Sequence, residues 1–287
     1  MQIVREPARM RAVVQAARAA GRRVGFVPTM GALHAGHASL AAEAARSCDD
    51  VAVSIFVNPT QFAPHEDFSR YPRSFDADCA LLERQGATWV FAPAVEEIYP
   101  PGNATRIVVG GPALVFEGAM RPGHFDGVAT VVYRLFHAVP ADVAYFGAKD
   151  WQQTVVVRRM VDDLALPIEI VVCPTVREPD GLAMSSRNAY LSPEERSRAV
   201  ALSAGLERAA KLWHSGASPR AIEAAVRDAL AARGIDCDYV AVVDPDSLDD
   251  LAAHDSEAGP AVVLVAGRLG TTRLIDNAFL PRRPAPA

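Results

Sequence analysis

Two histidines three positions apart are the first residues of the sequence that could do chemistry together. His34 and His37 lie in the stretch GFVPTMGALHAGHASL, with Gly36 between them. Three interpretations fit this stretch: an ordinary turn between a strand and a helix, a metal site, or a phosphate site. A zinc site needs at least one more ligand, and no sequence neighbour supplies one. The metal site is therefore the least favoured of the three, and we assign no metal-ligating residues.

A phosphate site would draw on the start of a helix. Its N–H groups and dipole favour anions, and Gly36 would let a ligand approach the backbone closely. Imidazoles three positions apart lie on one side of a helical turn, so His34 and His37 could both donate to phosphate oxygens. Taken alone, the spacing leaves the turn and the phosphate site both open.

Lys149 and Asp150, in the stretch FGAKDWQQ, are a second candidate pair. Only two of the 29 lysines and arginines are lysines, and the other is Lys211. A solvated lysine is the ordinary interpretation. In a chain that otherwise uses arginine, however, Lys149 suggests a position that requires a compact ammonium, which binds phosphate as a point charge. Asp150 could equally be a helix cap.

Two further polar segments follow apolar or turn sequences. FVNPTQF places Asn58 and Gln61 after a strand-like run. An Asn-Pro turn explains this segment, but amides also suit a substrate with hydroxyls and a carboxylate, because they both donate and accept. GLAMSSRN follows the turn sequence PDG. It is either a polar loop between domains or a clamp on phosphates built from Ser185, Ser186 and Arg187.

The elements that must position these residues alternate along the first part of the chain. Short apolar runs bounded by turn residues alternate with helix-like segments, which predicts βαβ units in an α/β fold with a parallel sheet. Ligands bind such sheets beyond the carboxyl ends of the strands, where the polar segments lie. The expected strands are 24–27, 51–57, 88–91, 143–146 and 168–172, and the expected helices are 37–48, 75–85, 127–139 and 152–164.

The pattern changes after about residue 177. Ser192, Pro193 and Glu195 form a capping-box sequence at the start of a helix, and a second helix follows residue 219. The strand-like runs 238–244, 261–270 and 271–280 come next. This order predicts a smaller α+β domain. We therefore expect one α/β domain over residues 1–176, which carries most of the polar segments, and a smaller C-terminal domain over residues 177–287.

Composition narrows the class of protein. No apolar run among the 287 residues approaches the roughly 20 residues of a membrane span, and residues 1–21 read as an amphipathic helix rather than a signal peptide. A net charge of -5 without a basic stripe argues against nucleic acid as a partner. The four dispersed cysteines suit reduced thiols. We expect a cytoplasmic protein with no membrane partner.

A family resemblance emerges from the motifs together. The H-x-G-H motif at His34–His37, after a first Rossmann-type strand, resembles the nucleotidylyltransferase and class I aminoacyl-tRNA synthetase superfamily. The longer PTMGALHAGHASL resembles the pantoate–β-alanine ligase family, also called pantothenate synthetases. FVNPTQF, RPGHFDGV, FGAKDWQQ and REPDGLAMSSRN follow in the family's order. Ala148 departs from the pattern, since many members have glutamate there.

The resemblance implies that residues 1–176 form a Rossmann-like domain that binds ATP and pantoate, and that residues 177–287 close over the site. It also implies a two-step reaction. ATP and (R)-pantoate would form pantoyl adenylate and pyrophosphate, and the amine of β-alanine would then displace AMP to give pantothenate. Mg²⁺ would bridge phosphate oxygens. Another H-x-G-H nucleotidylyltransferase and a non-catalytic nucleotide sensor are the rivals. Gln61 and Gln153 argue against a phosphorylated substrate, which would call for more arginine and lysine.

The resemblance also assigns roles to residues. His34, His37 and Lys149 would be catalytic, by stabilising charge on the triphosphate, and His37 could also handle a proton. Residues that would bind ATP are Met30, Gly31, Ala32, Leu33, His34, Ala35, Gly36, His37, Gly147, Ala148, Lys149, Asp150, Val176, Met184, Ser185, Ser186 and Arg187. Residues that would bind pantoate or β-alanine are Asn58, Gln61, Tyr71, Arg121 and Gln153.

Three expectations stay open at this point. For Arg121 and His124, structural roles are as well founded as substrate contact. The resemblance implies a homodimer, and residues 107–109 could form a sheet edge at its interface. His65, His137, His214 and His254 lack any motif and are expected to be ordinary surface or packing residues.

Overall fold

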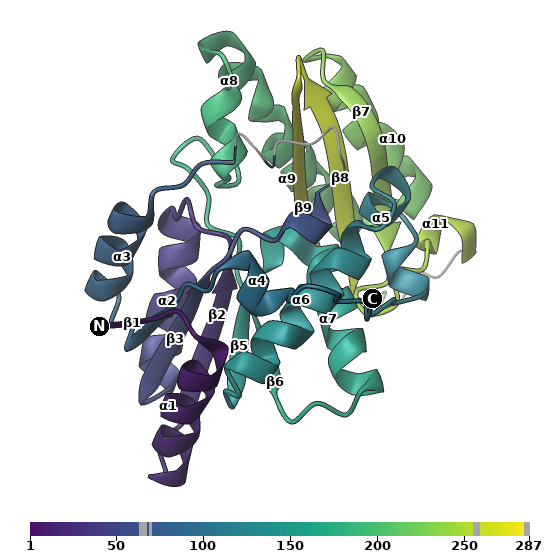
Figure 1. The fold of residues 1–287 in the computed structure, drawn as a ribbon. Helices are drawn as coiled ribbons and strands as arrows, with labels where there is room; N and C mark the ends of the chain where they lie inside the picture. Colours follow the sequence, from purple (N-terminus) through teal and green to yellow (C-terminus); the bar gives the residue numbers. More distant parts are fainter. Residues whose placement is uncertain (63–67, 69–70, 255–258, 284–287) are drawn as a thin grey trace. The chain divides into compact units, whose positions relative to one another are not determined.

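The computed structural model describes residues 1–62, 68, 71–254 and 259–283 (Figure 1). The chain forms two compact units. The first comprises Met1–Ala148 and Gln152–Pro174, and the second comprises Lys149–Trp151 and Thr175–Ala287. Lys149, Asp150 and Trp151 therefore pack with the C-terminal part of the chain, although they lie between elements of the first unit.

The first unit is built on a parallel six-stranded sheet in the order β1-β4-β3-β2-β5-β6. The strands are β1 (Gln2–Val4), β2 (Val24–Thr29), β3 (Asp50–Ile55), β4 (Trp89–Phe91), β5 (Val143–Gly147) and β6 (Glu169–Cys173). The five expected strands are confirmed. Strand β1 was not predicted, because three residues at a sheet edge carry no readable periodicity.

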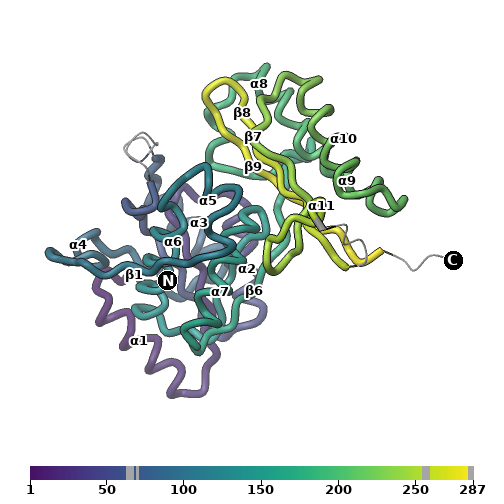
Figure 2. Tube along the Cα trace, turned by 90° about the vertical axis from the view of Figure 1, so that its right-hand side faces the viewer, coloured from purple at the N-terminus to yellow at the C-terminus, as the bar shows by residue number. Residues whose placement is uncertain are grey.

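Helices cover both faces of this sheet, because successive side chains of a strand point to opposite sides. Phe26 and Phe146 pack with one set of helices, whereas Val27 and Tyr145 pack with the other. The first set is α1 (Pro7–Ala19), α6 (His124–Ala138) and α7 (Trp151–Asp163), and the second is α2 (Ala35–Ser47) and α3 (Phe75–Arg84). Figures 1 and 2 show this layering.

Short helices connect the longer elements. They are η1 (Pro59–Gln61), α4 (Val95–Ile98), η3 (Gly111–Ala113), α5 (Glu117–Met120), η4 (Ala148–Asp150), η5 (Ser186–Tyr190) and α11 (Leu251–His254). Residues 107–109 pair with no described strand of this chain, and the sheet edge expected at a dimer interface stays a prediction. The Ile107 N–H donates to Thr130 Oγ1 at 2.9 Å, and Val108 is 61% exposed.

The second unit has an antiparallel sheet in the order β7-β8-β9, made of β7 (Asp236–Val243), β8 (Ala261–Leu269) and β9 (Thr272–Leu280). Its main helices are α8 (Pro193–Ala199), α9 (Ala201–His214) and α10 (Pro219–Ala231). The capping box is present: Ser192 N–H donates to Glu195 Oε2 at 2.9 Å, and Glu195 N–H donates to Ser192 Oγ at 3.2 Å. The predicted fold class, a Rossmann-like α/β unit followed by a smaller α+β unit, is confirmed.

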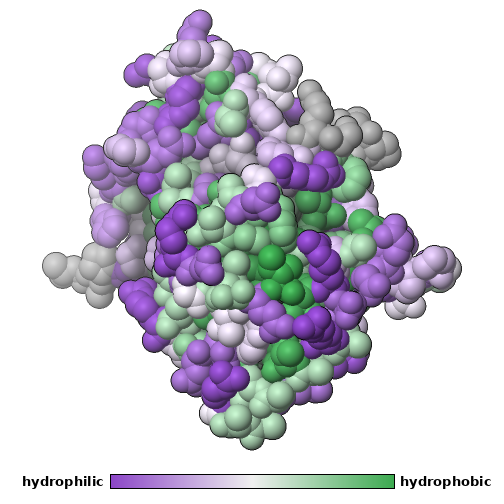
Figure 3. Space-filling view, turned by 60° about the vertical axis from the view of Figure 1, so that its left-hand side comes forward, coloured by the Kyte–Doolittle hydropathy of each residue, from purple (hydrophilic) through white to green (hydrophobic). Residues whose placement is uncertain are grey.

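The exposure of individual side chains can be compared with what the composition predicted. Figure 3 shows one face on which hydrophobic side chains gather near the middle, surrounded by hydrophilic ones. Within the described residues, every helix is too short or too polar to cross a membrane. His137 and His214 are exposed, as expected; His65 and the side chain of His254 lie outside the described residues. The four cysteines are thiols, and burial raises the pKa of Cys173.

Candidate active site

The central strands of the parallel sheet bring three of the polar segments to one edge. Strands β3, β2 and β5 are neighbours and run in the same direction. Residues 30–37 leave β2, residues 58–61 leave β3, and residue 147 ends β5. The chain order reverses between β2 and β5, and ligands of open α/β sheets bind at such a switch point. These segments therefore lie where the fold is suited to hold a ligand.

His34 and His37 form a capping box at the start of α2. The Gly36 N–H donates to His34 Nδ1 at 3.1 Å, and the His34 N–H donates to His37 Nδ1 at 3.3 Å. The two rings lie with their centroids 4.2 Å apart. Because a backbone N–H can only donate, both Nδ1 atoms must be acceptors, so each neutral imidazole carries its proton on Nε2. Both rings are thereby set up as Nε2–H donors.

Gly36 is required by this arrangement. A Cβ at Gly36 would lie 2.9 Å from His34 Cε1 and 3.0 Å from His34 Nδ1. The His34 ring therefore packs against Gly36, in space that a side chain at position 36 would fill. This role was not expected from the sequence, where Gly36 was interpreted only as room for a ligand.

Asp78 fixes the loop that precedes His34, and the sequence analysis did not identify it. Its buried carboxylate accepts hydrogen bonds from the N–H groups of Ala32 and Leu33, each at 2.9 Å. Ser74 Oγ donates to the same carboxylate at 2.9 Å. Ala32 has a left-handed backbone, with φ of 51°, which is unfavourable for a residue with a Cβ. The carboxylate therefore stabilises a strained turn; the only sequence signal was an aspartate in the first helical turn.

Asn58 and Gln61 form a hydrogen-bond network at the exit of β3. Asn58 is 1% exposed, and its Nδ2 donates to Gln61 Oε1 at 3.0 Å and to Gly127 O at 3.1 Å. Its Oδ1 accepts from Thr60 N–H and from Tyr99 Oη. Gln61 Nε2 contacts Met30 Sδ at 2.9 Å. Asn58 therefore orients Gln61 beside the β2 exit.

Arg121 and His124 hold the main chain of Gln61. Its carbonyl accepts from His124 Nδ1 at 2.9 Å and from Arg121 Nη2 at 3.3 Å. Arg121 Nη1 lies 3.0 Å from His124 Nε2, which accepts because Nδ1 is the donor. Gly127 completes the approach, since a Cβ there would lie 2.5 Å from Thr60 O. These contacts favour the structural alternative that the sequence left open for Arg121 and His124.

Two adjacent glutamines of α7 have different environments. Gln152 is buried; its Nε2 donates to Pro112 O and Val115 O, each at 2.7 Å, and its Oε1 accepts from Glu117 N–H at 3.0 Å. Gln153 is half-buried, and its side chain makes no hydrogen bond within the described part of the chain. Of the two, Gln153 is the one whose amide is available to a ligand. Tyr71, also expected at the site, is buried and packs on Phe62 at 5.9 Å.

Lys149 belongs to the second unit. Its Nζ lies 3.7 Å from Asp150 Oδ1, and its carbonyl accepts from Asn277 Nδ2 at 2.8 Å. Trp151 Nε1 donates to Pro245 O at 3.0 Å. The Lys149 side chain is 20% exposed. The turn that carries the lysine is thus held through its main chain and through Trp151.

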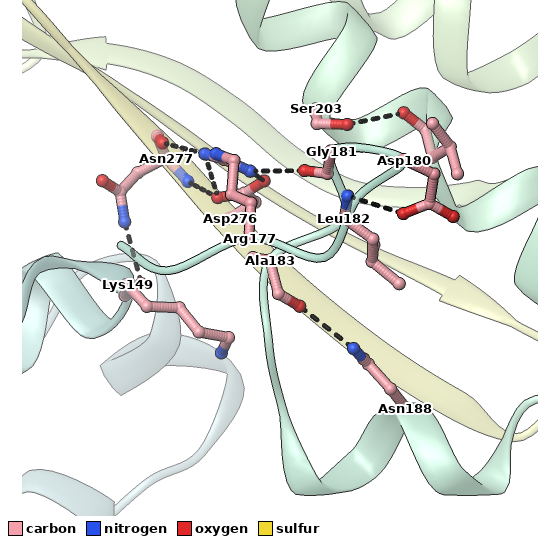
Figure 4. A network of polar contacts seen from close by, with 11 residues as sticks. Lys149, Arg177, Asp180, Gly181, Leu182, Ala183, Asn188, Ser203, Asp276 and Asn277 are labelled. Carbon is pink, nitrogen blue, oxygen red and sulfur yellow. Dashed lines mark hydrogen bonds and ion pairs between the residues drawn. The ribbon is translucent and has the colours of Figure 1, made fainter. Parts of the chain in front are cut away.

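The segment 177–188 folds as a braced loop (Figure 4). Met184 N–H donates to Val176 O at 3.0 Å, and Arg177 pairs with Ala183 in an antiparallel bridge. Ser185 Oγ accepts from Arg187 N–H at 3.3 Å and caps η5. The predicted phosphate clamp Ser185, Ser186 and Arg187 therefore sits at the first turn of a short helix, half-buried.

Arg196 secures the same loop from α8. Its guanidinium bonds Glu178 Oε2 at 2.7 Å and Asp180 Oδ2 at 2.6 Å, and Asn188 Nδ2 donates to Glu178 Oε1 at 2.8 Å. The bonds from Arg196 lower the pKa values of both Glu178 and Asp180. The sequence analysis missed Arg196, since nothing in its helical context marks it as a partner of a distant loop.

The predicted site residues thus fall on both units. In the first unit, the structure links Gln61 to Met30 and to Arg121, and pairs His34 with His37. In the second, it links Lys149 with Asp150, and Val176 with Met184. The described residues contain no cluster of three or more histidines, cysteines or carboxylates that could hold a metal ion.

Known proteins match this chain over nearly its whole length. The profile of the pantoate-beta-alanine ligase family matches residues 2–279. A pantothenate synthetase of Acidiphilium cryptum is 53% identical over 278 residues, which are 96% of this chain and 99% of the relative. The crystal structure of pantothenate synthetase from Thermus thermophilus matches with a TM-score of 0.91 and 50% identity, over 97% of this chain and 99% of that chain.

A further structure was solved with ligands. Pantoate-beta-alanine ligase from Francisella tularensis, complexed with beta-gamma ATP and beta-alanine, matches with a TM-score of 0.81 and 32% identity, over 97% of each chain. Similarity of this extent covers both units and every motif described above. The chain therefore belongs to the pantoate–beta-alanine ligase family.

Proposed function

We propose that the chain condenses (R)-pantoate with β-alanine at the expense of ATP, giving pantothenate, AMP and pyrophosphate. The observation that carries this proposal is the family match over residues 2–279, which includes both units and all five signature segments. A relative bound to ATP and β-alanine supports two of the three substrates.

The reaction would proceed in two steps. A carboxylate oxygen of pantoate attacks the α-phosphorus of ATP, the bond to the bridging oxygen breaks, and pyrophosphate leaves. The amine of β-alanine then attacks the acyl carbon of the adenylate, loses a proton, and displaces AMP. Neither step needs a protein nucleophile, so the chain must supply alignment and charge stabilisation.

His34 and His37 would bind the triphosphate as neutral donors. Their Nδ1 atoms accept backbone N–H groups, so Nε2–H is the group that would meet phosphate oxygens. A proton transfer by His37 would therefore start from Nε2. The adjacent N–H groups at the start of α2 favour the same anion.

The second unit would supply the remaining positive charge and hydroxyls. Lys149, with Ser185, Ser186 and Arg187, would bind the β- and γ-phosphates. Mg²⁺ carried on the phosphates would neutralise part of their charge. Mg²⁺ commonly keeps several waters and binds through substrate phosphates, which fits a chain whose described residues hold no cage of three ligands. The expected closure of residues 177–287 over the site stays a prediction.

Gln153 and Gln61 would contact pantoate. The Gln153 amide has no partner in the described chain, so it can donate to and accept from the hydroxyls and carboxylate of this substrate. Gln61 is held by Asn58 and by the two side chains on its carbonyl. Asn58 and Arg121 would then act mainly by orienting Gln61.

Product analysis tests the proposal against its rivals. AMP and pantothenate should appear in equal amounts, and only when ATP, pantoate and β-alanine are all present. A nucleotidylyltransferase would instead transfer AMP to a phosphorylated or alcohol substrate and form no amide. A nucleotide sensor would bind ATP without turnover. Either result would refute the ligase assignment.

We also propose that the protein is a homodimer in the cytoplasm. The irregular segment 102–114 exposes Val108 and Leu114 to 61% and 66%, while Val109 and Ala113 are buried. Exposed apolar side chains beside a packed core suit a protein interface. Sedimentation analysis should give twice the chain mass, and Leu114→Asp should shift it towards the monomer. A monomeric wild type would refute the dimer.

A further inference from the structure

Two adjacent residues of β9 connect the lysine turn with the serine-rich loop. Asp276 and Asn277 are 3% and 6% exposed. Their side chains reach two segments that are far apart in the sequence (Figure 4). Within the second unit, Asn277 reaches Lys149, and Asp276 reaches the residue that opens the loop 177–188.

Asn277 holds the main chain of Lys149. Asn277 Nδ2 donates to Lys149 O at 2.8 Å. In Figure 4 the Lys149 side chain begins beside this hydrogen bond, and its ammonium lies apart from the Asn277 amide. A hydrogen bond to the carbonyl of a residue fixes the Cα from which its side chain starts. The position of the ammonium therefore depends on Asn277, which does not touch the ammonium itself.

Asp276 holds the loop that carries Ser185, Ser186 and Arg187. The Arg177 guanidinium makes two bonds to the Asp276 carboxylate, at 2.6 and 3.0 Å, and a third to Gly181 O at 3.1 Å. A paired fork of this kind sets direction as well as distance. The first residue of the loop and its turn are therefore both anchored to β9.

The two anchors are linked to each other. Asn277 N–H donates to Asp276 Oδ1 at 2.8 Å, and Arg177 Nη2 lies 3.4 Å from Asn277 O. Side chains of neighbouring strand residues point to opposite faces, so a dipeptide can hold one segment on each side. The spacing between the lysine turn and the loop is thereby fixed by one rigid strand.

We propose that Asn277 is a positioning residue for adenylate formation, which places the Lys149 ammonium against the triphosphate. Asp276 does the same for the serine-rich loop through Arg177. This inference rests on the proposed function, since it assumes that Lys149 binds phosphate. It predicts that Asn277 affects the step that uses ATP and not the step that uses β-alanine.

The first test separates the two half-reactions. We expect Asn277→Ala to reduce pantoate-dependent ATP–pyrophosphate exchange about tenfold, mostly as a higher KM for ATP, because a buried carbonyl loses its donor. The reaction of synthetic pantoyl adenylate with β-alanine should stay within about twofold of wild type, since it needs no triphosphate. Asn277→Asp, which turns an acceptor towards Lys149 O, should be at least as impaired in exchange.

Thr272→Val is the matched control. Thr272 is a buried polar residue of the same strand, and the substitution nearly preserves its shape. Its two half-reactions should both resemble wild type. If the wild type shows no pantoate-dependent exchange, the proposed function fails before any variant is compared, which separates that failure from a failure of the Asn277 role.

A double-mutant cycle identifies the route of the effect. The dissociation constant of α,β-methylene-ATP with Mg²⁺ is measured for wild type, Asn277→Ala, Lys149→Ala and the double variant. If Asn277 acts through Lys149, its substitution weakens binding about tenfold in wild type and less than about twofold once the lysine is absent.

Four results would overturn the proposal. The first two are an equal loss of rate in both half-reactions of Asn277→Ala, and no loss in its ATP–pyrophosphate exchange. The third is a weakening of nucleotide binding by Asn277→Ala that is as large in the Lys149→Ala protein as in wild type. The fourth is that Asn277→Ala, Asn277→Asp and Asn277→Ser all fail to fold, as judged by circular dichroism. The last would make Asn277 a purely structural residue of β9.

Discussion

The turn that leads into the two histidines depends on a single carboxylate, so Asp78→Asn should weaken it. Asp78 accepts the N–H groups of Ala32 and Leu33 and a hydroxyl from Ser74, each at 2.9 Å. The asparagine keeps one accepting oxygen and turns an NH₂ group towards a backbone N–H. One charge-assisted bond is lost, the others become neutral, and one buried donor is left unsatisfied.

The size of the effect follows from these bonds. A hydrogen bond to a charged group contributes about 1.5–3 kcal/mol, and an unsatisfied buried donor costs about 1–3 kcal/mol. The left-handed backbone of Ala32 costs the native turn about 1–2 kcal/mol, and the hydrogen bonds of the carboxylate offset this cost. The lost bond and the unsatisfied donor concern the same backbone N–H, so their contributions overlap rather than add, and we expect Asp78→Asn to destabilise the turn by about 2–4 kcal/mol. Because 1.4 kcal/mol corresponds to a factor of ten in an equilibrium constant, the equilibrium constant for opening of the turn should rise about 30-fold or more.

Amide hydrogen exchange measures this opening directly. Protection of the Ala32 and Leu33 amides should fall about 30-fold or more, and pantoate-dependent ATP–pyrophosphate exchange should fall with it. Asp76→Asn is the control, because Asp76 lies in the same first turn of α3 but is exposed, and surface changes of this kind stay within about 0.5 kcal/mol.

Two outcomes would refute the reasoning about Asp78. The first is unchanged protection of the Ala32 and Leu33 amides in Asp78→Asn. The second is equal losses of protection in Asp78→Asn and Asp76→Asn. In either case the carboxylate would not be the group that stabilises the turn.

Three further predictions concern the two units. Lys149→Ala should lower ATP–pyrophosphate exchange by about 100-fold or more, since it removes a charge that meets the triphosphate, with an unchanged circular dichroism spectrum. Gly36→Ala should reduce exchange about tenfold by displacing the His34 ring, although alanine would otherwise stabilise a helix by about 0.5–1 kcal/mol. Arg196→Gln should destabilise the second unit at pH 7, and the difference from wild type should shrink as pH falls below the unfolded pKa of Glu178. The folded pKa of Glu178 lies below its unfolded value, so its stabilisation is present above the unfolded pKa and is lost as pH falls through the folded pKa.

Each of these has a result that would contradict it. Near-normal exchange in a folded Lys149→Ala protein would remove the phosphate role of the lysine. A Gly36→Ala protein with wild-type exchange would show that the His34 ring need not lie over position 36. For Arg196→Gln, a difference in urea midpoint from wild type that stays constant as pH falls from 7 through the acid range would exclude the ion pairs as the cause.

Periodicity was sufficient to predict the fold because its signals are local. The central strands β2 and β3 and the helix α2 that joins them were expected within a few residues of their observed bounds. The edge strand β1 was missed because its three residues owe their conformation to pairing with β4, almost 90 positions away. Long-range pairing leaves no mark on so short a segment.

The candidate site was predictable in part for the same reason. The sequence motifs identified His34, His37 and Lys149 as candidate site residues. They did not mark Asp78 or Asn277, whose importance comes from contacts 45 and 128 positions along the chain. A buried side chain that orients another residue looks like any polar residue until its partner is known.

Under the proposed contacts of Gln61 and Gln153 with pantoate, the network around Asn58 also decides which of these two positions can be changed to alter the substrate. The Gln61 side chain is bound to Asn58 and to the methionine beside it, so a new side chain there would break both contacts, while the carbonyl of residue 61 stays held from α6. Gln153 projects from α7 without such ties. An effort to evolve acceptance of a different hydroxy acid should therefore diversify position 153 first, and should treat position 61 as part of the scaffold.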